Sequence, residues 1–150
     1  MWKNVMIRFL TDTEVEITIG KHIHRAGFAE MGFADGRKIG TPNAQWYLLK
    51  LFAETGGSLP ASDPKAKERY RKQKQLLSER LKRYFGIEFP PFKLYNKKTG
   101  YTLKMLIFVD EKAKLKKVPD DFFDGDNEVD RMFAGLAGHI ELDDTDESEE

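Results

Sequence analysis

The sequence predicts an α+β fold, and three observations support this. Apolar and polar residues alternate over 5–10 and 14–19, which is the two-residue period of β-strands. Apolar residues recur at helical spacing within 42–85, and alternation returns over 92–109. We therefore expect N-terminal antiparallel strands, then two to three helices, then a C-terminal β-hairpin.

The first two strands are predicted to form a hairpin. Thr11-Asp12-Thr13 supplies a short turn between them, and Gly20 ends the second strand. Asp12 and its neighbours Glu14 and Glu16 are expected to be exposed edge residues. Glycines recur through 21–41, so this stretch is expected to be irregular or short-stranded. Its expected core contacts are Ile23, Phe28, Met31 and Phe33.

Two helices follow, each with recognisable start and stop signals. The first begins at Thr41-Pro42-Asn43, where Thr41 or Asn43 can cap it, and ends at Gly56-Gly57. The second begins at Ser62-Asp63-Pro64, continues to Phe85 and stops at Gly86. On a helical wheel, its apolar residues fall within a narrow arc that should pack inward. These residues are Tyr70, Leu77, Leu81 and Tyr84.

The C-terminal strand pair is predicted as a hairpin wing over 92–109. Its arms are 92–95 and 101–109, and the turn between them ends in Gly100. Lys97 and Lys98 lie at the predicted tip, with Lys93 and Lys104 on the arms. A basic tip suits a phosphate ridge or a minor groove.

Charge divides the chain into a basic domain, 1–118, and an acidic tail, 119–150. The whole chain has a net charge of zero, but its first 118 residues hold 24 Lys and Arg against 12 Asp and Glu. The last 32 residues hold 1 basic and 13 acidic residues. A basic body indicates a phosphate backbone or an acidic surface as partner. The tail is expected to be partly disordered, with a short amphipathic helix within 126–136.

Several function classes are disfavoured. The chain has no Cys, which excludes disulfides and cysteine-based metal sites and suits a cytoplasmic protein. No signal peptide or run of about 20 apolar residues is present, so no membrane association is expected. No cofactor is expected, and no Ser, His and carboxylate set suggests an enzyme. His22 and His24 fall on one side of a strand, but no further ligands complete a metal site. Acidic residues at 124–130 lack the glycine and spacing of a calcium loop.

The most informative segment is the second helix. Residues 64–83 hold nine Lys and Arg against two Asp and Glu. On one face of this helix, about 100° around the axis from the apolar arc, polar and basic residues recur at spacings of three and four. The row consists of Lys67, Arg71, Lys74, Ser78 and Lys82, with Gln75 beside it. Like charges on neighbouring turns repel each other, and a polyanion converts this repulsion into attraction through counterion release.

From about 42 to 108 the chain resembles a known family. The likeness is carried by NAQWYLLKLFAETGGSL at 43–59, QLLSERLKRYFGI at 75–87 and GYTLKM at 100–105. These segments resemble the winged-helix effector domain of OmpR/PhoB-type response regulators. The resemblance implies that residues about 67–82 enter the major groove and that the Lys97-Lys98 hairpin contacts the backbone or minor groove. Three departures are the missing receiver domain, the replacement of the short second helix by SLPASDPKAKERYRK, and the acidic tail.

The sequence therefore predicts a DNA-binding transcriptional regulator with duplex DNA as its partner. Gln75 and Ser78 are expected to read base edges, and Arg71 or Lys74 to contact guanine or phosphate. The predicted DNA-binding residues are Lys67, Arg71, Lys74, Gln75, Ser78, Lys82, Lys97 and Lys98. The alternative is a winged-helix protein-interaction module that binds a protein partner or forms a homodimer. In either case the acidic tail is expected to be regulatory, either by covering the basic face as a DNA mimic or by binding a partner.

Overall fold

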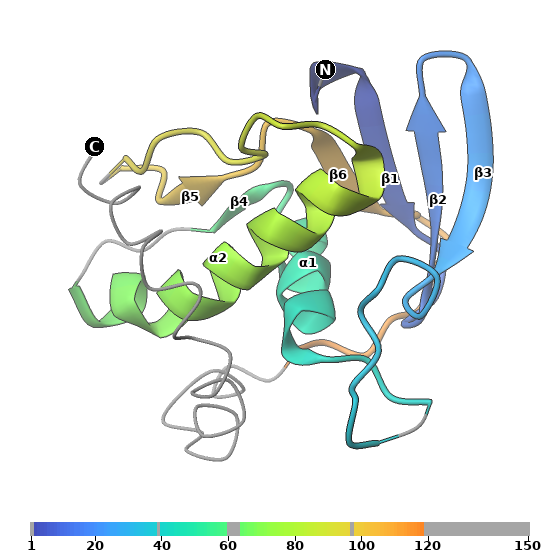
Figure 1. Ribbon diagram of the computed structural model, residues 1–150, viewed down its shortest axis with the longest axis horizontal. Helices are drawn as coiled ribbons and strands as arrows, with labels where there is room; N and C mark the ends of the chain where they lie inside the picture. The colour runs from blue at the N-terminus through green and yellow to red at the C-terminus, as the bar shows by residue number, and fades with distance from the viewer. Residues whose placement is uncertain (1, 39, 60–63, 97, 119–150) are drawn as a thin grey trace.

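The computed structural model describes residues 2–38, 40–59, 64–96 and 98–118, with the side chains of 64–69 excepted. The acidic tail and its expected helix at 126–136 lie outside these residues. The described chain is α+β, as the sequence predicts, and it contains two helices and a mixed sheet (Figure 1). The elements are a 3-10 turn (Trp2–Asn4), β1 (Val5–Phe9), β2 (Glu14–Ile19), β3 (His22–Gly27), α1 (Ala44–Glu54), β4 (Ser58–Leu59), α2 (Pro64–Phe85), β5 (Tyr101–Thr102) and β6 (Leu106–Val109).

The main sheet has the strand order β3-β2-β1-β6. β1 is antiparallel to β2, as predicted, and β2 is antiparallel to β3. β6 pairs with β1 in parallel, with Ile107 opposite Ile7. Inward residues alternate with outward ones along β1, which is the pattern of a sheet covered on one face. α1 packs on β1 and β6, and α2 crosses over α1 (Figure 1).

The hairpin predicted over 92–109 is present only in its first part, and its predicted second part is wrong. The Phe92–Leu103 and Asn96–Gly100 bridges form a hairpin over 91–104. The other side of its second arm pairs with β4, where Leu59 lies opposite Tyr101. Residues 106–109 leave this hairpin and form β6 in the main sheet. The physical reason is a non-local pairing with β1, for which the local sequence gives no signal.

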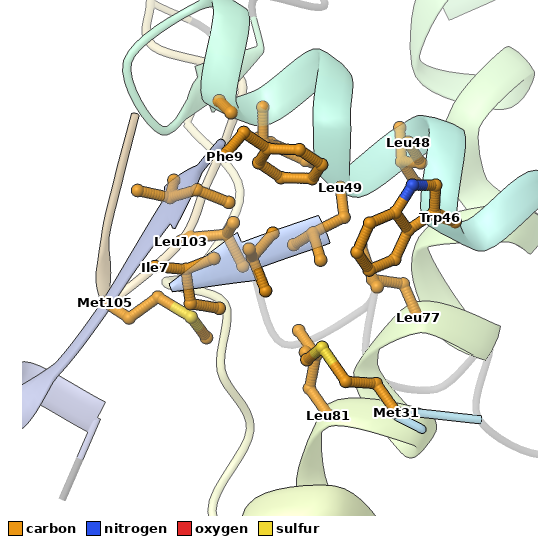
Figure 2. Close-up of a cluster of buried hydrophobic side chains, with 14 of the residues drawn as sticks. Ile7, Phe9, Met31, Trp46, Leu48, Leu49, Leu77, Leu81, Leu103 and Met105 are labelled. Carbon is orange, nitrogen blue, oxygen red and sulfur yellow. The ribbon is translucent and has the colours of Figure 1, made fainter. Parts of the chain in front are cut away.

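The hydrophobic core lies between the sheet and the helices (Figure 2). Trp46 of α1 is at its centre, with ring centroids 5.1 Å from Phe9 and 5.6 Å from Phe33. Leu77 and Leu81 of α2 are fully buried beside it. Met31 and Phe33 are buried as predicted, and Phe28 is partly buried against the core. The prediction for Ile23 is wrong, because its side chain is 65% exposed on β3.

Three helix boundaries confirm the predicted signals, while the expected cap at Ser62-Asp63 lies outside the described residues. Asn43 is the N-cap of α1, and its side chain accepts a hydrogen bond from the Trp46 N–H at 3.1 Å. Gly56 and Gly57 follow the helix with φ of 73° and 98°. Gly86 follows α2 with φ of 66°, a conformation that glycine adopts without steric cost and that ends the helix.

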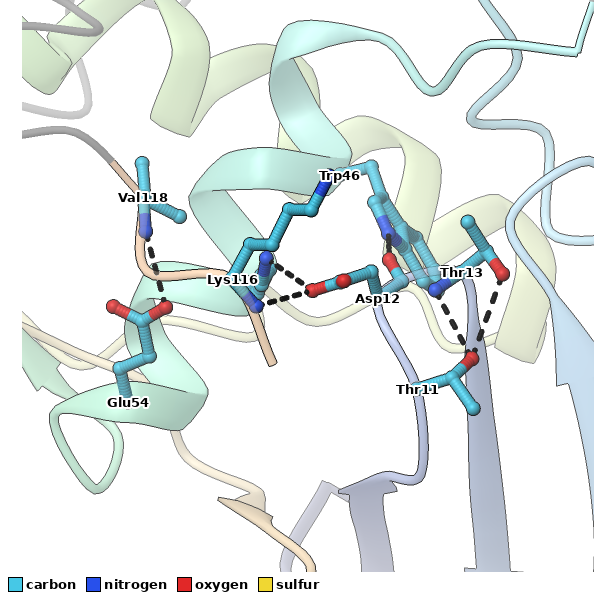
Figure 3. Close-up of polar contacts among 8 residues, drawn as sticks. Thr11, Asp12, Thr13, Trp46, Glu54, Lys116 and Val118 are labelled. Carbon is cyan, nitrogen blue, oxygen red and sulfur yellow. Dashed lines mark hydrogen bonds and ion pairs between the residues drawn. The ribbon is translucent and has the colours of Figure 1, made fainter. Parts of the chain in front are cut away.

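Polar contacts of Asp12 join α1 to the β1–β2 turn and to the segment before Val118 (Figure 3). We call the contacts of Asp12 with Lys50, Trp46 and Lys116 the polar clasp. The Lys50 ammonium is almost fully buried and lies 2.6 Å from a carboxylate oxygen of Asp12. The same carboxylate accepts the Lys116 backbone N–H at 2.9 Å, and the Asp12 carbonyl accepts the Trp46 indole N–H at 2.8 Å. Farther along, the Val118 N–H donates to Glu54 at 3.3 Å.

The prediction that Asp12 and Glu16 are merely exposed edge residues is wrong, because both carboxylates have partners. Asp12 fixes the β1–β2 turn and the 110–118 segment to α1. Glu16 accepts a 2.6 Å hydrogen bond from Arg8, which also contacts Asp110 at 3.2 Å. Both carboxylates therefore take part in contacts between separate segments of the domain and are not merely exposed surface groups.

Candidate nucleic-acid interface

One side of α2 packs against α1, and the candidate site lies on the remaining sides of the helix. Tyr70, Leu77 and Leu81 are buried as predicted, and Tyr84 is partly buried against the core. A buried hydrogen bond of 2.6 Å from the Gln45 side chain to that of Gln73 joins the two helices. The orientation of α2 is therefore fixed by both apolar and polar contacts.

The expectation that Gln75 and Ser78 read base edges is not met in this conformation. Their residues are 8% and 7% exposed, so neither presents its polar group to the surface. Direct readout requires a donor or acceptor that reaches the edge of a base pair in the groove. These two residues therefore belong to the packed part of α2 and not to a reading face.

Lys74 joins α2 to the 91–104 hairpin. Its ammonium nitrogen lies 5.3 Å from the centroid of the Phe92 ring and 5.2 Å from that of Tyr101. Cation–π contacts of this geometry are worth about 0.5–2 kcal/mol. The side chain predicted to contact guanine or phosphate thus fixes the hairpin against the helix.

Two other members of the predicted row lie on the flank of α2. Arg71 and Lys82 are half-buried, and the Lys82 ammonium lies 3.6 Å from a carboxylate oxygen of Glu79. An exposed pair of this spacing contributes only a few tenths of a kcal/mol, so Lys82 can exchange it for a phosphate. Lys67 lies within α2, but its side chain is outside the described part of the chain, as is Lys97.

In the part of α2 whose side chains are described, Tyr70 to Phe85, the exposed cations are Lys72 and Arg83. They are eleven residues apart, which places them nearly in line and about 16 Å apart along the axis. The sequence interpretation missed them because it looked 100° from the apolar arc. A helical wheel contains the missing signal, since Lys72 and Arg83 lie about 160° and about 140° from the mean direction of Tyr70, Leu77 and Leu81.

The hairpin adds exposed lysines beside the helix. Its turn is closed by reciprocal backbone hydrogen bonds between Asn96 and Gly100, at 3.3 and 2.6 Å. The Asn96 side chain accepts the Lys98 N–H at 2.7 Å, which orders the turn while the Lys98 side chain stays exposed. Lys93 and Lys104 are exposed on the two arms. The basic tip and flanks predicted for this hairpin therefore reach solvent, with Lys97 outside the description.

The sequence from Tyr70 to Lys104 is strongly basic overall. It contains ten Lys and Arg against two Asp and Glu. We define the α2–hairpin surface as the six described cations on the outer side and flank of α2 and on the hairpin: Lys72, Lys82, Arg83, Lys93, Lys98 and Lys104. Such a surface attracts polyanions over a range set by ionic strength.

The other candidate sites, which were considered for metal binding, acquire no further ligands in the described part of the structure. His22 and His24 are exposed on β3, and the His24 ring nitrogen lies 3.4 Å from the Tyr84 hydroxyl. Among the described residues, no three His, Cys, Asp or Glu side chains gather to hold a metal ion. The acidic stretch 124–130 lies outside these residues. Within the same description, neither helix combines the length and apolar character needed to cross a membrane.

Comparison of the chain with protein-family models, with curated proteins and with solved structures found no match.

Proposed function

We propose that the chain binds nucleic acid, with duplex DNA as the preferred partner, through the α2–hairpin surface. The main observation behind this proposal is the position of the Lys74 ammonium, which contacts both the Phe92 ring and the Tyr101 ring. This contact joins a basic helix and a basic hairpin, so the two elements that carry the exposed cations are held in a fixed arrangement. A fixed array of cations gains more from a regular polyanion than the same charges on independent segments.

The order of the elements supports the proposal. α1 is followed by the short strand β4, by α2 and by the hairpin, whose second arm lies between β4 and the first arm. This order resembles that of a winged helix without its short second helix, with a long helix for the major groove and a hairpin for the backbone or minor groove. A transcriptional regulator is the role we propose on this basis.

The proposed contacts differ from those expected from the sequence. Lys72, Arg83 and Lys98 would contact phosphates, with Lys82 on the flank. Gln75 and Ser78 are omitted, because their burial keeps them from base edges. Phosphate contacts supply affinity and position without reading sequence, so strong salt dependence is the expected property of this surface.

Charge neutralisation tests the proposal. In the Lys72→Gln/Arg83→Gln/Lys98→Gln variant, the slope of log K against log salt concentration is expected to fall by about three, at about 0.9 per phosphate contact. At about 0.1 M salt, affinity for duplex DNA should fall by a factor of 10² or more. Fluorescence anisotropy with labelled duplexes over a salt series measures both quantities.

A matched variant controls for the loss of charge itself. Lys21→Gln/Arg25→Gln/Lys112→Gln removes the same number of exposed cations from the β2–β3 turn, from β3 and from the turn after β6, away from the hairpin. Its slope should stay within one unit of the parent value. Equal losses in both variants, or no salt-dependent binding by the parent protein, would reject the α2–hairpin surface as a DNA site.

A protein-interaction module is the second candidate function, and a separate observation favours it. Phe89 and Leu94, between α2 and the hairpin turn, are 58% and 64% exposed. Exposed large apolar side chains on one segment are typical of protein interfaces. This function predicts a partner whose affinity falls on Phe89→Ser/Leu94→Ser substitution and changes little with salt.

A further inference from the structure

β3 presents a free edge to solvent. It is the outermost strand of the order β3-β2-β1-β6, and only β2 pairs with it among the described residues. The five residues from Lys21 to Arg25 are all exposed, including Ile23 at 65%. A free edge with an exposed branched residue at its centre readily accepts a further strand, and proteins usually protect such edges.

The basic residues and histidines along this edge favour pairing with an acidic strand. Lys21, His22, His24 and Arg25 surround the central Ile23, and no acidic residue lies among them. A second copy of β3 paired antiparallel about Ile23 would place Lys21 opposite Arg25. Like charges directly opposite each other destabilise a strand pair, so the edge disfavours its own copy.

We propose that residues 140–144 of the same chain, Ile-Glu-Leu-Asp-Asp, pair with the free edge of β3. In this segment apolar Ile140 and Leu142 alternate with acidic Glu141 and Asp143, the two-residue period of a strand. With Leu142 opposite Ile23, Glu141 and Asp143 fall opposite the two histidines in either strand direction. Asp144 then falls opposite Lys21 or Arg25.

The connection is long enough for this pairing. The Val118 N–H is hydrogen-bonded to Glu54, which fixes the point from which the acidic segment leaves the domain. The 21 residues from 119 to 139 can span up to about 70 Å when extended. A domain of this size has a radius of gyration of only about 13 Å, so the segment can reach β3 from Val118. Tethering also gives it an effective concentration on the order of millimolar.

This pairing is independent of nucleic-acid binding, and its test contains no nucleic acid. Hydrogen exchange followed by mass spectrometry on the full chain measures protection of the β3 amides. Glu141→Lys/Asp143→Lys should accelerate exchange over 21–27 at least tenfold and leave β1 unchanged. Glu149→Lys/Glu150→Lys makes the same change of charge at the end of the chain and should leave β3 protected.

Three outcomes would overturn the pairing. Unchanged exchange in the first variant would show that Glu141 and Asp143 do not hold a strand on β3. Equal acceleration in both variants would assign the effect to overall charge. Protection accompanied by a dimer mass in light scattering would assign the added strand to a second copy, whereas a monomer mass supports pairing within one chain.

Discussion

Leu77→Ala is expected to lower the free energy of unfolding by about 3 kcal/mol, within the range of about 2–5 kcal/mol for buried leucines. Leu77 is 0% exposed and lies at the junction of α1, α2 and the sheet, next to Trp46 (Figure 2). Truncation loses the transfer free energy of its methyl groups and leaves a cavity that two crossed helices cannot close. α2 would lose one of its main anchors on the domain.

The neighbouring Leu76 provides a matched control. It is one position along α2 and only half-buried, so Leu76→Ala makes the same chemical change with less loss of packing. Urea denaturation followed by tryptophan fluorescence should give a loss below about 1 kcal/mol for this control. Similar losses for both variants would contradict the packing of α2 described above.

Asp12→Ala is expected to cost about 2–3 kcal/mol of stability, because it leaves the Lys50 ammonium buried without its partner. The Lys50 side chain is 3% exposed, whereas that of Asp12 is 36% exposed. The estimate is therefore below the cost of breaking a fully buried pair, which is about 3–5 kcal/mol. The substitution also removes the acceptor for the Lys116 N–H, so the 110–118 segment should loosen.

A compensating variant separates charge burial from packing. Asp12→Ala/Lys50→Met removes both charges and keeps an apolar side chain of similar length at position 50. Because an apolar replacement of a buried ion pair is often neutral or better, this double variant should recover at least half of the loss. No recovery would show that Lys50 is not the group destabilised by Asp12→Ala.

The same carboxylate makes stability depend on pH in acid. Burial raises the pKa of Asp12, but the hydrogen bonds from Lys50 and Lys116 and their charges outweigh it, and the pKa is lowered from 3.8. The stabilisation is complete above the unfolded pKa of about 3.9 and is lost as pH falls through the lower folded value. The stability difference between the parent protein and Asp12→Asn should be constant near neutral pH and shrink below about pH 4. Urea denaturation at pH 3, 5 and 7 measures it, and a difference that grows in acid would contradict the pairing.

Local sequence signals were sufficient for most element boundaries. The cap at Asn43 and the stops at Gly56 and Gly86 act within a few residues of themselves, so the sequence contains them in full. The same is true of the β1–β2 hairpin, whose register is set by a short turn and strict alternation. The prediction failed for β6 because Tyr101, Leu103, Met105 and Ile107 are all buried in unbroken alternation. Nothing in that pattern marks where the chain changes from one sheet to the other.

The helix and the hairpin that the sequence singled out are both present in the fold, since dense charge and a glycine-closed turn are local properties. Which of their side chains are exposed was predicted less well, because Lys74 packs against the rings of the hairpin and because Gln75 and Ser78 are buried. The helical wheel already places Lys72 and Arg83 away from the apolar arc, but which of the other cations are exposed depended on how the neighbours of α2 pack.

By itself, the sequence determined the two helices, the β1–β2 hairpin and the division of the charge between a basic stretch, 1–118, and an acidic stretch, 119–150. These properties depend on residues that are close along the chain or on composition. Only the tertiary structure decided the parallel pairing of β6, the Asp12–Lys50 clasp and the set of cations that reach solvent. Each of these depends on which distant segments pack together, and the same local pattern is compatible with several such packings.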